Sequence, residues 1–404
     1  MGLLAYSVVI QTIAIAIGLI KQSSANGDFK FVSDSGLYGP TLEVAHAYYG
    51  QWPTGLDATN VYNGSNNVIQ VGEHTSITEE SAYPSLEMNQ PPGGAINYTT
   101  TPPTSANHQD YFIGVQSVVV DALDRLWILD TGRVIGPDGA VLPAAYGGPK
   151  LVGVDLTTNQ VFKTIVFPPE VAYADSYLND VRFDLRASLT ESGRGVGYIT
   201  DSSFTGRNAI IVVDLGTGES WRHIGLAESV RGESQFLSFI WGQPTYYTSS
   251  NISPLTTNPI GSDGIALSAD GETLYFGPVA SRYMYSVPTA RLRARGPTSE
   301  LLAQQSVVNH GQKGQSDGFE TDSNNLIYVG NNELNAINVF NPINGTTSLF
   351  VRDPRINWVD TMSAGTDGYL YFTSNQLLAN PKTRPFALFK APLPDGAKKA
   401  SHVL

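Results

Sequence analysis

A recurring arrangement of strands and turns constrains the fold of this 404-residue chain most strongly. In each copy a polar residue opens one predicted strand, and an aromatic residue follows 11 or 12 positions later in the next. The polar and aromatic residues of the four clearest copies are Gln116 and Trp127, Asp263 and Tyr275, Asp317 and Tyr328, and Asp360 and Tyr371. A spacing that repeats this closely indicates one structural unit used several times, rather than unrelated hairpins.

A fifth copy starts at Asn179 and Asp180, and its aromatic residue, Tyr198, follows Asp180 after 18 positions, which indicates a longer turn. Tyr275 and Tyr328 are 53 positions apart, and Tyr371 follows 43 positions later. These periods suit a four-stranded propeller blade, and six blades with long loops would take about 63 residues each. We therefore predict an all-β fold, a six-bladed β-propeller of four-stranded blades.

A β-sandwich is the alternative fold, because Asp-Gly turns also join its strands. A sandwich gives no reason for a fixed spacing to a buried aromatic residue, so the propeller is favoured. Propellers need their chain ends to complete the last blade. We expect the segment 43–49 to pair with strands near 386–391.

The composition agrees with an all-β globular protein. The chain has 40 Gly and 24 Pro but only four Met, which favours short strands joined by turns over helical bundles. Its net charge of −12 leaves no basic surface for a nucleic-acid partner. Cysteine is absent, which excludes disulfides, cysteine nucleophiles and thiolate metal sites.

The N-terminal segment resembles a secretory signal. Residues 3–20 are nearly all apolar, and the small residues Ser23 and Ala25 suit cleavage after Ala25. We expect a signal peptide over residues 1–25 and one propeller domain over residues 26–404, with an uncleaved membrane anchor as the alternative. After cleavage we expect a secreted protein without membrane attachment. Secreted proteins can be N-glycosylated, and the candidate N-x-S/T sequons are at Asn63, Asn97, Asn251 and Asn344.

The polar residues that open the repeats are the candidate site. Inner strands of a propeller line a central channel, so equivalent positions converge at one channel mouth. The predicted ligand-binding residues are Gln116, Asn179, Asp180, Asp263, Asp317 and Asp360. Hard oxygen ligands of this kind suit Ca²⁺ or another divalent cation, for which Asn179, Asp263 and Asp317 are the candidates.

Two further interpretations of this ring of polar residues at the channel mouth stay open. Without a metal, the carboxylates would attract cationic ligands, helped by nearby aromatic residues. The candidate aromatic residues are Tyr111, Phe112, Trp241, Tyr246, Tyr247 and Trp358. Alternatively, the Asp side chains accept hydrogen bonds from the local backbone and only cap turns.

Several segments resemble the major royal jelly protein/Yellow family. They are residues 121–133, 149–156, 274–278 and 285–289, within a similarity that runs from about residue 40 to 392. The resemblance implies a secreted six-bladed propeller with roles that include amine binding, pigment-pathway chemistry and nutritive storage. The chain departs from the insect members of this family in having no cysteine.

Three functions follow from the ring and the resemblance. The first is a small-molecule protein that binds or converts an amine, a catechol or a pigment intermediate at the central channel. The alternative is a divalent-metal-dependent, lactonase-like hydrolase, because the ring resembles that of gluconolactonase-like propellers. Gln116 stands where those enzymes carry Glu, which weakens that interpretation. The third is a storage or surface protein without a catalytic site.

Overall fold

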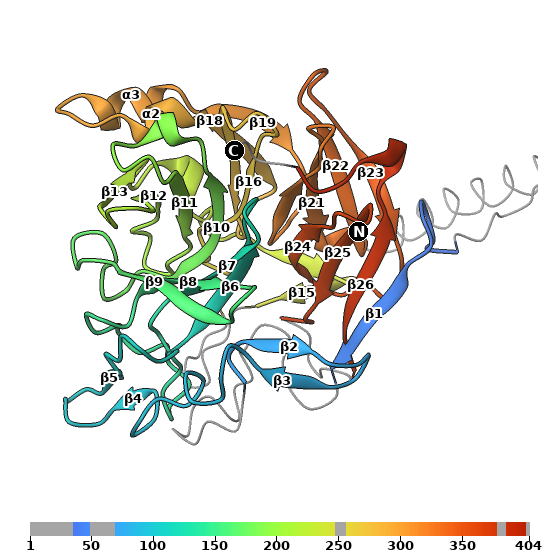
Figure 1. Cartoon of the computed structure of the whole chain (residues 1–404). Coiled ribbons are helices and arrows are strands. Elements are labelled where there is room, and N and C mark those ends of the chain that lie inside the picture. The colour runs from blue at the N-terminus through green and yellow to red at the C-terminus, as the bar shows by residue number, and fades with distance from the viewer. Residues whose placement is uncertain (1–34, 49–68, 247–255, 378–384, 401–404) are drawn as a thin grey trace, which may run out of the picture. The chain divides into compact units, whose positions relative to one another are not determined.

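The computed structural model describes residues 35–48, 69–246, 256–377 and 385–400 (Figure 1). Within them, five antiparallel sheets of four strands each form a β-propeller. The first two sheets are β6 (Val115–Val120), β7 (Arg125–Asp130), β8 (Lys150–Asp155) and β9 (Gln160–Val166), then β10 (Leu178–Asp184), β11 (Val196–Asp201), β12 (Ala209–Asp214) and β13 (Ser220–His223). The third comprises β16 (Ser262–Leu267), β17 (Thr273–Pro278), β18 (Tyr283–Pro288) and β19 (Val308–Gln312).

The remaining two sheets complete the ring. The fourth comprises β20 (Phe319–Thr321), β21 (Ile327–Asn331), β22 (Ala336–Asn341) and β23 (Thr346–Arg352). The fifth comprises β24 (Val359–Ala364), β25 (Tyr369–Ser374), β26 (Phe386–Pro392) and the N-terminal strand β1 (Glu43–Tyr48).

The chain ends close the fifth blade as expected. Strand β1 pairs antiparallel with β26, with Tyr48 opposite Phe386, and the two ribbons run side by side in Figure 1. Because the outer strand of this blade comes from the other end of the chain, neither end can unpair without opening the blade.

The prediction of six blades is wrong, because the structure has five. Each of the five sequence repeats forms one blade, and the expectation of a sixth rests on chain length and on the family resemblance rather than on a sixth repeat. Inner strands β10 and β16 of the second and third sheets contact each other directly, so the residues between β13 and β16 place no blade between these sheets. The described part of this segment forms a short 3-10 helix (Glu228–Val230) and the hairpin of β14 (Ser238–Ile240) and β15 (Gln243–Thr245).

Other residues outside the blades form short elements. The segment before β6 contains two hairpins, β2 (Gly72–His74) with β3 (Glu80–Ala82) and β4 (Ile96–Asn97) with β5 (Thr104–Ser105). Two short helices, α2 (Thr289–Arg293) and α3 (Ser299–Gln305), interrupt the third blade between β18 and β19. No helix in the described part of the chain is long and apolar enough to cross a membrane.

The hydrophobic core lies between neighbouring blades. Trp127 and Leu151 of the first blade pack with Phe183 and Ile211 of the second in one buried cluster. Strand β12 is buried along its whole length, because both of its faces are covered by other blades or loops. Four of the five repeat aromatics are buried as predicted, and the fifth, Tyr371, is half-buried.

Candidate functional site

Five of the six predicted ligand-binding residues surround one cavity of about 150 Å³ at the channel mouth. Four of them occupy the second position of an inner strand, and Asp317 lies two residues before β20. They are Gln116, Asn179, Asp263, Asp317 and Asp360. The structure therefore brings together side chains from all five blades.

Irregular strand pairing turns these side chains toward the channel. Pairing shifts register across Gln116 in β6, Asn179 in β10, Asp263 in β16 and Asp360 in β24. Such bulges re-aim a side chain where a regular strand would send it elsewhere. The same local feature thus repeats at the mouth in four blades.

The Ser-Asp-Gly sequences fit this geometry because the inner strands come very close together there. A Cβ on Gly264 would lie 2.2 Å from the carbonyl oxygen of Asp317, and one on Gly318 would lie 1.9 Å from that of Asp360. Only glycine fits at either position. Each motif therefore presents one carboxyl group and admits the next blade beside it.

Asp180 does not join the mouth. It follows Asn179 directly, and its carboxylate accepts hydrogen bonds from Ser117 Oγ at 2.8 Å and from Arg182 Nη1 at 2.8 Å. It lines a second cavity further along the inner strands. Because neighbouring residues of an extended chain point in different directions, one of the pair faces each cavity.

In the cluster of three mouth carboxyl groups, Asp263 and Asp317 are buried, and Asp360 is half-buried and repelled by their charge. Asp263 and Asp317 share a hydrogen bond, which requires a proton on one of them. Asp317 Oδ2 accepts the indole N–H of Trp358 at 2.5 Å. The amide nitrogen of Asn179 donates to Asp263, and that of Asn375 donates to Asp360.

Burial and mutual repulsion keep protons on this cluster. Burial raises the pKa of Asp317 to about 6, although the Trp358 hydrogen bond opposes the rise. Burial, and then the neighbouring carboxyl groups, raise the pKa of Asp263 and of Asp360 well above the usual Asp range. The site can therefore exchange a proton for another cation.

The turn-capping interpretation does not describe these three residues. Other Asp side chains in the described regions do cap turns, since Asp121 accepts the N–H of Leu123 and Asp322 accepts that of Asn324. No backbone N–H bonds to the carboxyl groups of Asp263, Asp317 or Asp360 among the hydrogen bonds of the described residues. Their oxygen atoms face one another and the cavity.

The rest of the cavity wall is mostly apolar. Tyr177 and Phe204 form an aromatic pair with ring centroids 5.4 Å apart, and the Tyr177 hydroxyl donates to Gln116 Oε1 at 3.2 Å. The other apolar lining residues are Ile135, Val141, Ile260 and Leu377. The cavity thus has an acidic side and an apolar side.

Tyr177 was missed in the sequence, although a signal was present. It stands two positions before Asn179, as Trp358 does before Asp360. Of the predicted aromatic residues that the structure describes, Trp358 alone donates a hydrogen bond to a site carboxyl group, and it does not itself line the cavity. Phe112 belongs to the core, Trp241 is exposed, and Tyr247 lies outside the described residues.

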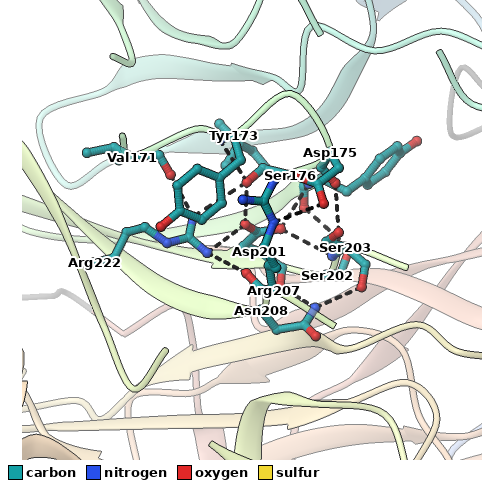
Figure 2. A network of polar contacts seen from close by, with 12 residues as sticks. Val171, Tyr173, Asp175, Ser176, Asp201, Ser202, Ser203, Arg207, Asn208 and Arg222 are labelled. Carbon is teal, nitrogen blue, oxygen red and sulfur yellow. Dashed lines mark hydrogen bonds and ion pairs between the residues drawn. The ribbon is translucent and has the colours of Figure 1, made fainter. Parts of the chain in front are cut away.

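A buried polar network fixes the loop that carries Tyr177 (Figure 2). Asp201, at the end of β11, accepts the N–H of Tyr177 at 2.9 Å and the hydroxyl of Ser176 at 2.6 Å. Arg222 forms an ion pair with Asp201 at 2.9 Å, and its guanidinium lies 4.4 Å from the centre of the Tyr173 ring. These contacts hold one wall of the cavity in place before any ligand arrives.

A buried lysine lies behind the carboxyl cluster. Lys313 is fully buried, and its ammonium donates to the carbonyl of Gly314 at 3.0 Å. Burial lowers the pKa of Lys313 to about 7, and the charge of Asp317 opposes the shift. No sequence pattern had pointed to this residue.

The candidate metal ligands do not form a metal site. The described residues contain no group of three or more His, Cys, Asp or Glu side chains that could hold a metal ion. Asn179 turns the N–H donors of its amide, rather than an oxygen, toward Asp263. A hydrogen-bond donor at that position opposes a cation coordinated by Asn179, Asp263 and Asp317.

The structure describes only some of the predicted glycosylation sites and does not describe the predicted processing site. Asn344 is exposed and Asn97 is half-buried, and each side chain accepts hydrogen bonds from the Thr of its own sequon. Asn63, Asn251 and the predicted signal peptide lie outside the described residues.

Comparison with known proteins gives a family match over two thirds of the chain. The model of the family described as major royal jelly protein matches residues 113–381. Protein yellow of Drosophila madeirensis is 25% identical over 282 residues, which cover 66% of this chain and 43% of that protein. Protein yellow of Drosophila pseudoobscura pseudoobscura is 26% identical over 290 residues, or 68% of this chain and 43% of that protein. The chain thus spans less than half the length of these relatives.

Among solved structures, the similarity is weaker. A gluconolactonase from Xanthomonas campestris is 14% identical, with a TM-score of 0.39 over 70% of this chain and 73% of that one. Regucalcin from Agrobacterium tumefaciens, a calcium-binding protein, is 12% identical, with a TM-score of 0.39 over 72% of this chain and 92% of that one. Similarity at this level carries no functional argument.

Proposed function

The chain belongs to the major royal jelly protein family, and from that premise we propose that it binds a small organic amine at the channel mouth. The observation that carries the proposal is the convergence of three carboxyl groups, two of them buried, on one side of a cavity with an apolar opposite side. Such a cavity suits a molecule with an ammonium group at one end and an apolar body at the other.

The charge of the cluster supports a cationic ligand. Asp263, Asp317 and Asp360 cannot all ionise when they lie this close in a buried site, so protons compensate their charge. An ammonium group would replace a shared proton and donate up to three hydrogen bonds to the carboxylates. A neutral molecule of the same shape would leave the protons where they are and gain much less.

The size and the apolar wall support a ligand with one ring. A cavity of about 150 Å³ lined by apolar side chains is large enough for benzene. Tyr177 and Phe204 offer aromatic surfaces on which a ring can pack edge to face or offset-stacked. Phenylethylamine-like compounds combine a ring of this size with an ammonium group.

The alternative functions have less support. A lactonase-like hydrolase needs a divalent cation, and the donor N–H of Asn179 opposes one at the candidate ligands. A storage protein without a site gives no reason for three mutually repelling carboxyl groups around one cavity, which cost folding free energy unless protons or a ligand neutralise them.

The test is a double variant, Asp263→Asn with Asp317→Asn. Calorimetry with 2-phenylethylamine should show at least a 30-fold loss of affinity, because the ammonium group loses about 2 kcal/mol or more of buried charge pairing. The uncharged analogue 2-phenylethanol should bind both proteins equally weakly. Unchanged amine binding in the double variant would refute the site.

A matched control separates binding from stability. Asp214 caps a turn by accepting the N–H groups of Gly216 and Thr217, away from the mouth. Asp214→Ala should cost about 0.5–2 kcal/mol of stability, by analogy with other side-chain caps, and leave amine affinity unchanged. Elemental analysis and a lactone-hydrolysis assay on the same samples test the alternative, which a stoichiometric divalent ion with lactone turnover would favour.

We also propose that the protein is secreted after cleavage at Ala25 and glycosylated at Asn97 and Asn344. The apolar N-terminal segment and the sequons support this. Mass spectrometry of protein recovered from the culture medium should find an N-terminus at Asn26. A mature chain that retains residues 1–25 would contradict the proposal.

A further inference from the structure

A second cavity, of about 170 Å³, lies further along the same inner strands. One part of its wall is apolar and includes Val119, Leu126, Phe183 and Met362. The polar part of its wall includes Asp180, Arg182, Glu320 and Lys399. A third carboxylate in the wall, that of Asp121, is already bonded to Arg125 and Trp127. The cavity wall thus carries charges of both signs, whereas the charged residues of the mouth cavity are all acidic.

Lys399 reaches this cavity from the C-terminal segment. Its backbone N–H donates to the carbonyl of Gly365 at 3.0 Å, so the segment is fixed to the fifth blade. Its ammonium donates to the carbonyl of Val120 at 2.6 Å. An ammonium group has three N–H donors, and no carboxylate of the described residues lies within ion-pair distance of this one. Lys399 therefore has hydrogen-bonding capacity left for a ligand.

Glu320 is the matching group of opposite charge. Its Oε1 accepts the N–H of Thr321 at 2.8 Å, and its Oε2 stands 3.9 Å from Arg182 Nη2, beyond hydrogen-bond distance. Arg182 is already engaged, because it donates to Asp180 at 2.8 Å and to the carbonyl of Phe319 at 2.6 Å. Asp180 and Arg182 thus form an internal pair, and Glu320 keeps an oxygen without a hydrogen bond.

The buried guanidinium adds an independent sign of an unfilled site. Arg182 is 5% exposed, and its Nε–H has no hydrogen-bond partner. A buried donor without a partner is uncommon in folded proteins and costs free energy. A negatively charged ligand group bound in the cavity beside Arg182 would lower that cost.

We propose that this second cavity binds a small apolar α-amino acid. Its carboxylate would lie at Lys399, on the side of the Arg182 charge, and its ammonium group at Glu320. Its side chain would pack against Val119, Leu126 and Met362. The proposal is independent of amine binding at the mouth.

The charge pattern favours a zwitterion over either ion alone. A simple carboxylate would gain Lys399 but would face Asp180 and Glu320, and a simple amine would gain Glu320 but would face Arg182 and Lys399. A ligand with adjacent charges of both signs meets each with its opposite. The apolar wall then accommodates a branched side chain such as that of leucine.

Calorimetry with L-leucine, isovalerate and isoamylamine tests the proposal. All three compounds contain an isobutyl group. L-leucine carries both charges, isovalerate carries only the negative charge, and isoamylamine carries only the positive charge. L-leucine should bind at least tenfold more tightly than isovalerate. Isoamylamine can also occupy the mouth, so its binding is compared in protein carrying Asp263→Asn with Asp317→Asn, where leucine affinity should be unchanged.

Variants of Lys399 and Glu320 locate the binding. Lys399→Met and Glu320→Gln should each weaken leucine binding at least tenfold. Lys398→Met is the matched control, since Lys398 is the exposed neighbour on the same segment and does not line the cavity. If Lys399→Met loosens the C-terminal segment, Glu320→Gln still decides, because it can keep the hydrogen bond to Thr321.

Three results would overturn the proposal. They are no leucine binding at millimolar concentration, unchanged leucine affinity in Glu320→Gln, and isovalerate binding as tight as that of leucine. Loss of leucine binding in the mouth double variant would also overturn it, because the amino acid would then occupy the mouth. Failure of amine binding alone would leave this proposal standing.

Discussion

Two buried pairs of Asp and Lys, in different blades, show how the same residue types serve different purposes. In the first blade, Asp130 accepts the N–H groups of Ile113, Gly114 and Gly132 and pairs with Lys150 at 2.9 Å. Lys150 also donates to the carbonyls of His108 and Gly148. Every charged atom of this pair has a partner within the protein.

The second pair is left incomplete. Asp317 receives one N–H, from Trp358, and shares a proton with Asp263. The ammonium group of Lys313 has a single hydrogen bond, to the carbonyl of Gly314, among the described residues. Saturated buried charges stabilise a fold, whereas unsaturated ones are maintained at the expense of stability and mark a binding or reactive site.

The largest expected effect contrasts the two lysines. Lys150→Met would strand the buried carboxylate of Asp130 and should cost about 3–5 kcal/mol of unfolding free energy. Lys313→Met replaces a poorly paired buried charge with an apolar group of similar size and should cost less than about 1 kcal/mol, or stabilise the fold. Urea denaturation of both variants measures this contrast. Equal losses would show that Lys313 is as integral to the fold as Lys150.

Stability should depend on pH through the second pair. The raised pKa of Asp317, about 6, means that the folded state binds more protons than the unfolded chain between about pH 4 and 6, so stability falls as pH rises across that range. The lowered pKa of Lys313, about 7, means that the unfolded chain binds more protons between about pH 7 and 10, so that stability rises there.

Melting temperatures from pH 4 to 10 test these opposite slopes. Asp317→Asn should reduce the acidic slope, to which the raised pKa values of Asp263 and Asp360 also contribute, and Lys313→Met should remove most of the alkaline one. A saturating amine should stabilise the protein more at pH 8 than at pH 5, because it binds the ionised cluster. Identical pH profiles in wild type and both variants would mean that neither group titrates differently on folding.

The sequence allowed much of the mouth to be predicted, because its residues recur at a fixed offset from a buried aromatic residue. Asp263 and Asp317 could be found because the Ser-Asp-Gly context repeats, and close approach of the inner strands requires that glycine. Asp180 could not be separated from Asn179, since the bulge that decides which side chain faces the mouth leaves no sequence signal.

The remaining differences have equally physical causes. Blade number was overestimated because a long chain can place residues in short hairpins and loops, and length does not distinguish these from a blade. The roles of Lys313, Asn375 and Lys399 depend on contacts between segments far apart in the sequence. Lys399, for example, bonds to Val120, 279 positions earlier. No local pattern encodes such a contact.

The smallest expected effect compares two indole donors. Trp358→Phe keeps a ring in the cluster with Ile240, Ile260 and Val279 but removes the N–H that Asp317 accepts. The pKa of Asp317 should rise further, since this hydrogen bond favours the ionised form. Amine affinity at pH 6.5 should fall by about tenfold, which corresponds to the roughly 1.5 kcal/mol of a hydrogen bond to a charged group.

Trp127→Phe is the matched control for that variant. Trp127 also donates its indole N–H to a buried carboxylate, that of Asp121 at 2.8 Å, but Asp121 caps a turn and lies outside the mouth. This variant should lose stability without losing amine affinity. The loss of amine affinity caused by Trp358→Phe should be smaller at pH 8.5 than at pH 6.5, because Asp317 ionises at pH 8.5 even without the indole. A loss of amine affinity that is the same at both pH values would show that Trp358 acts by packing rather than through the charge of Asp317.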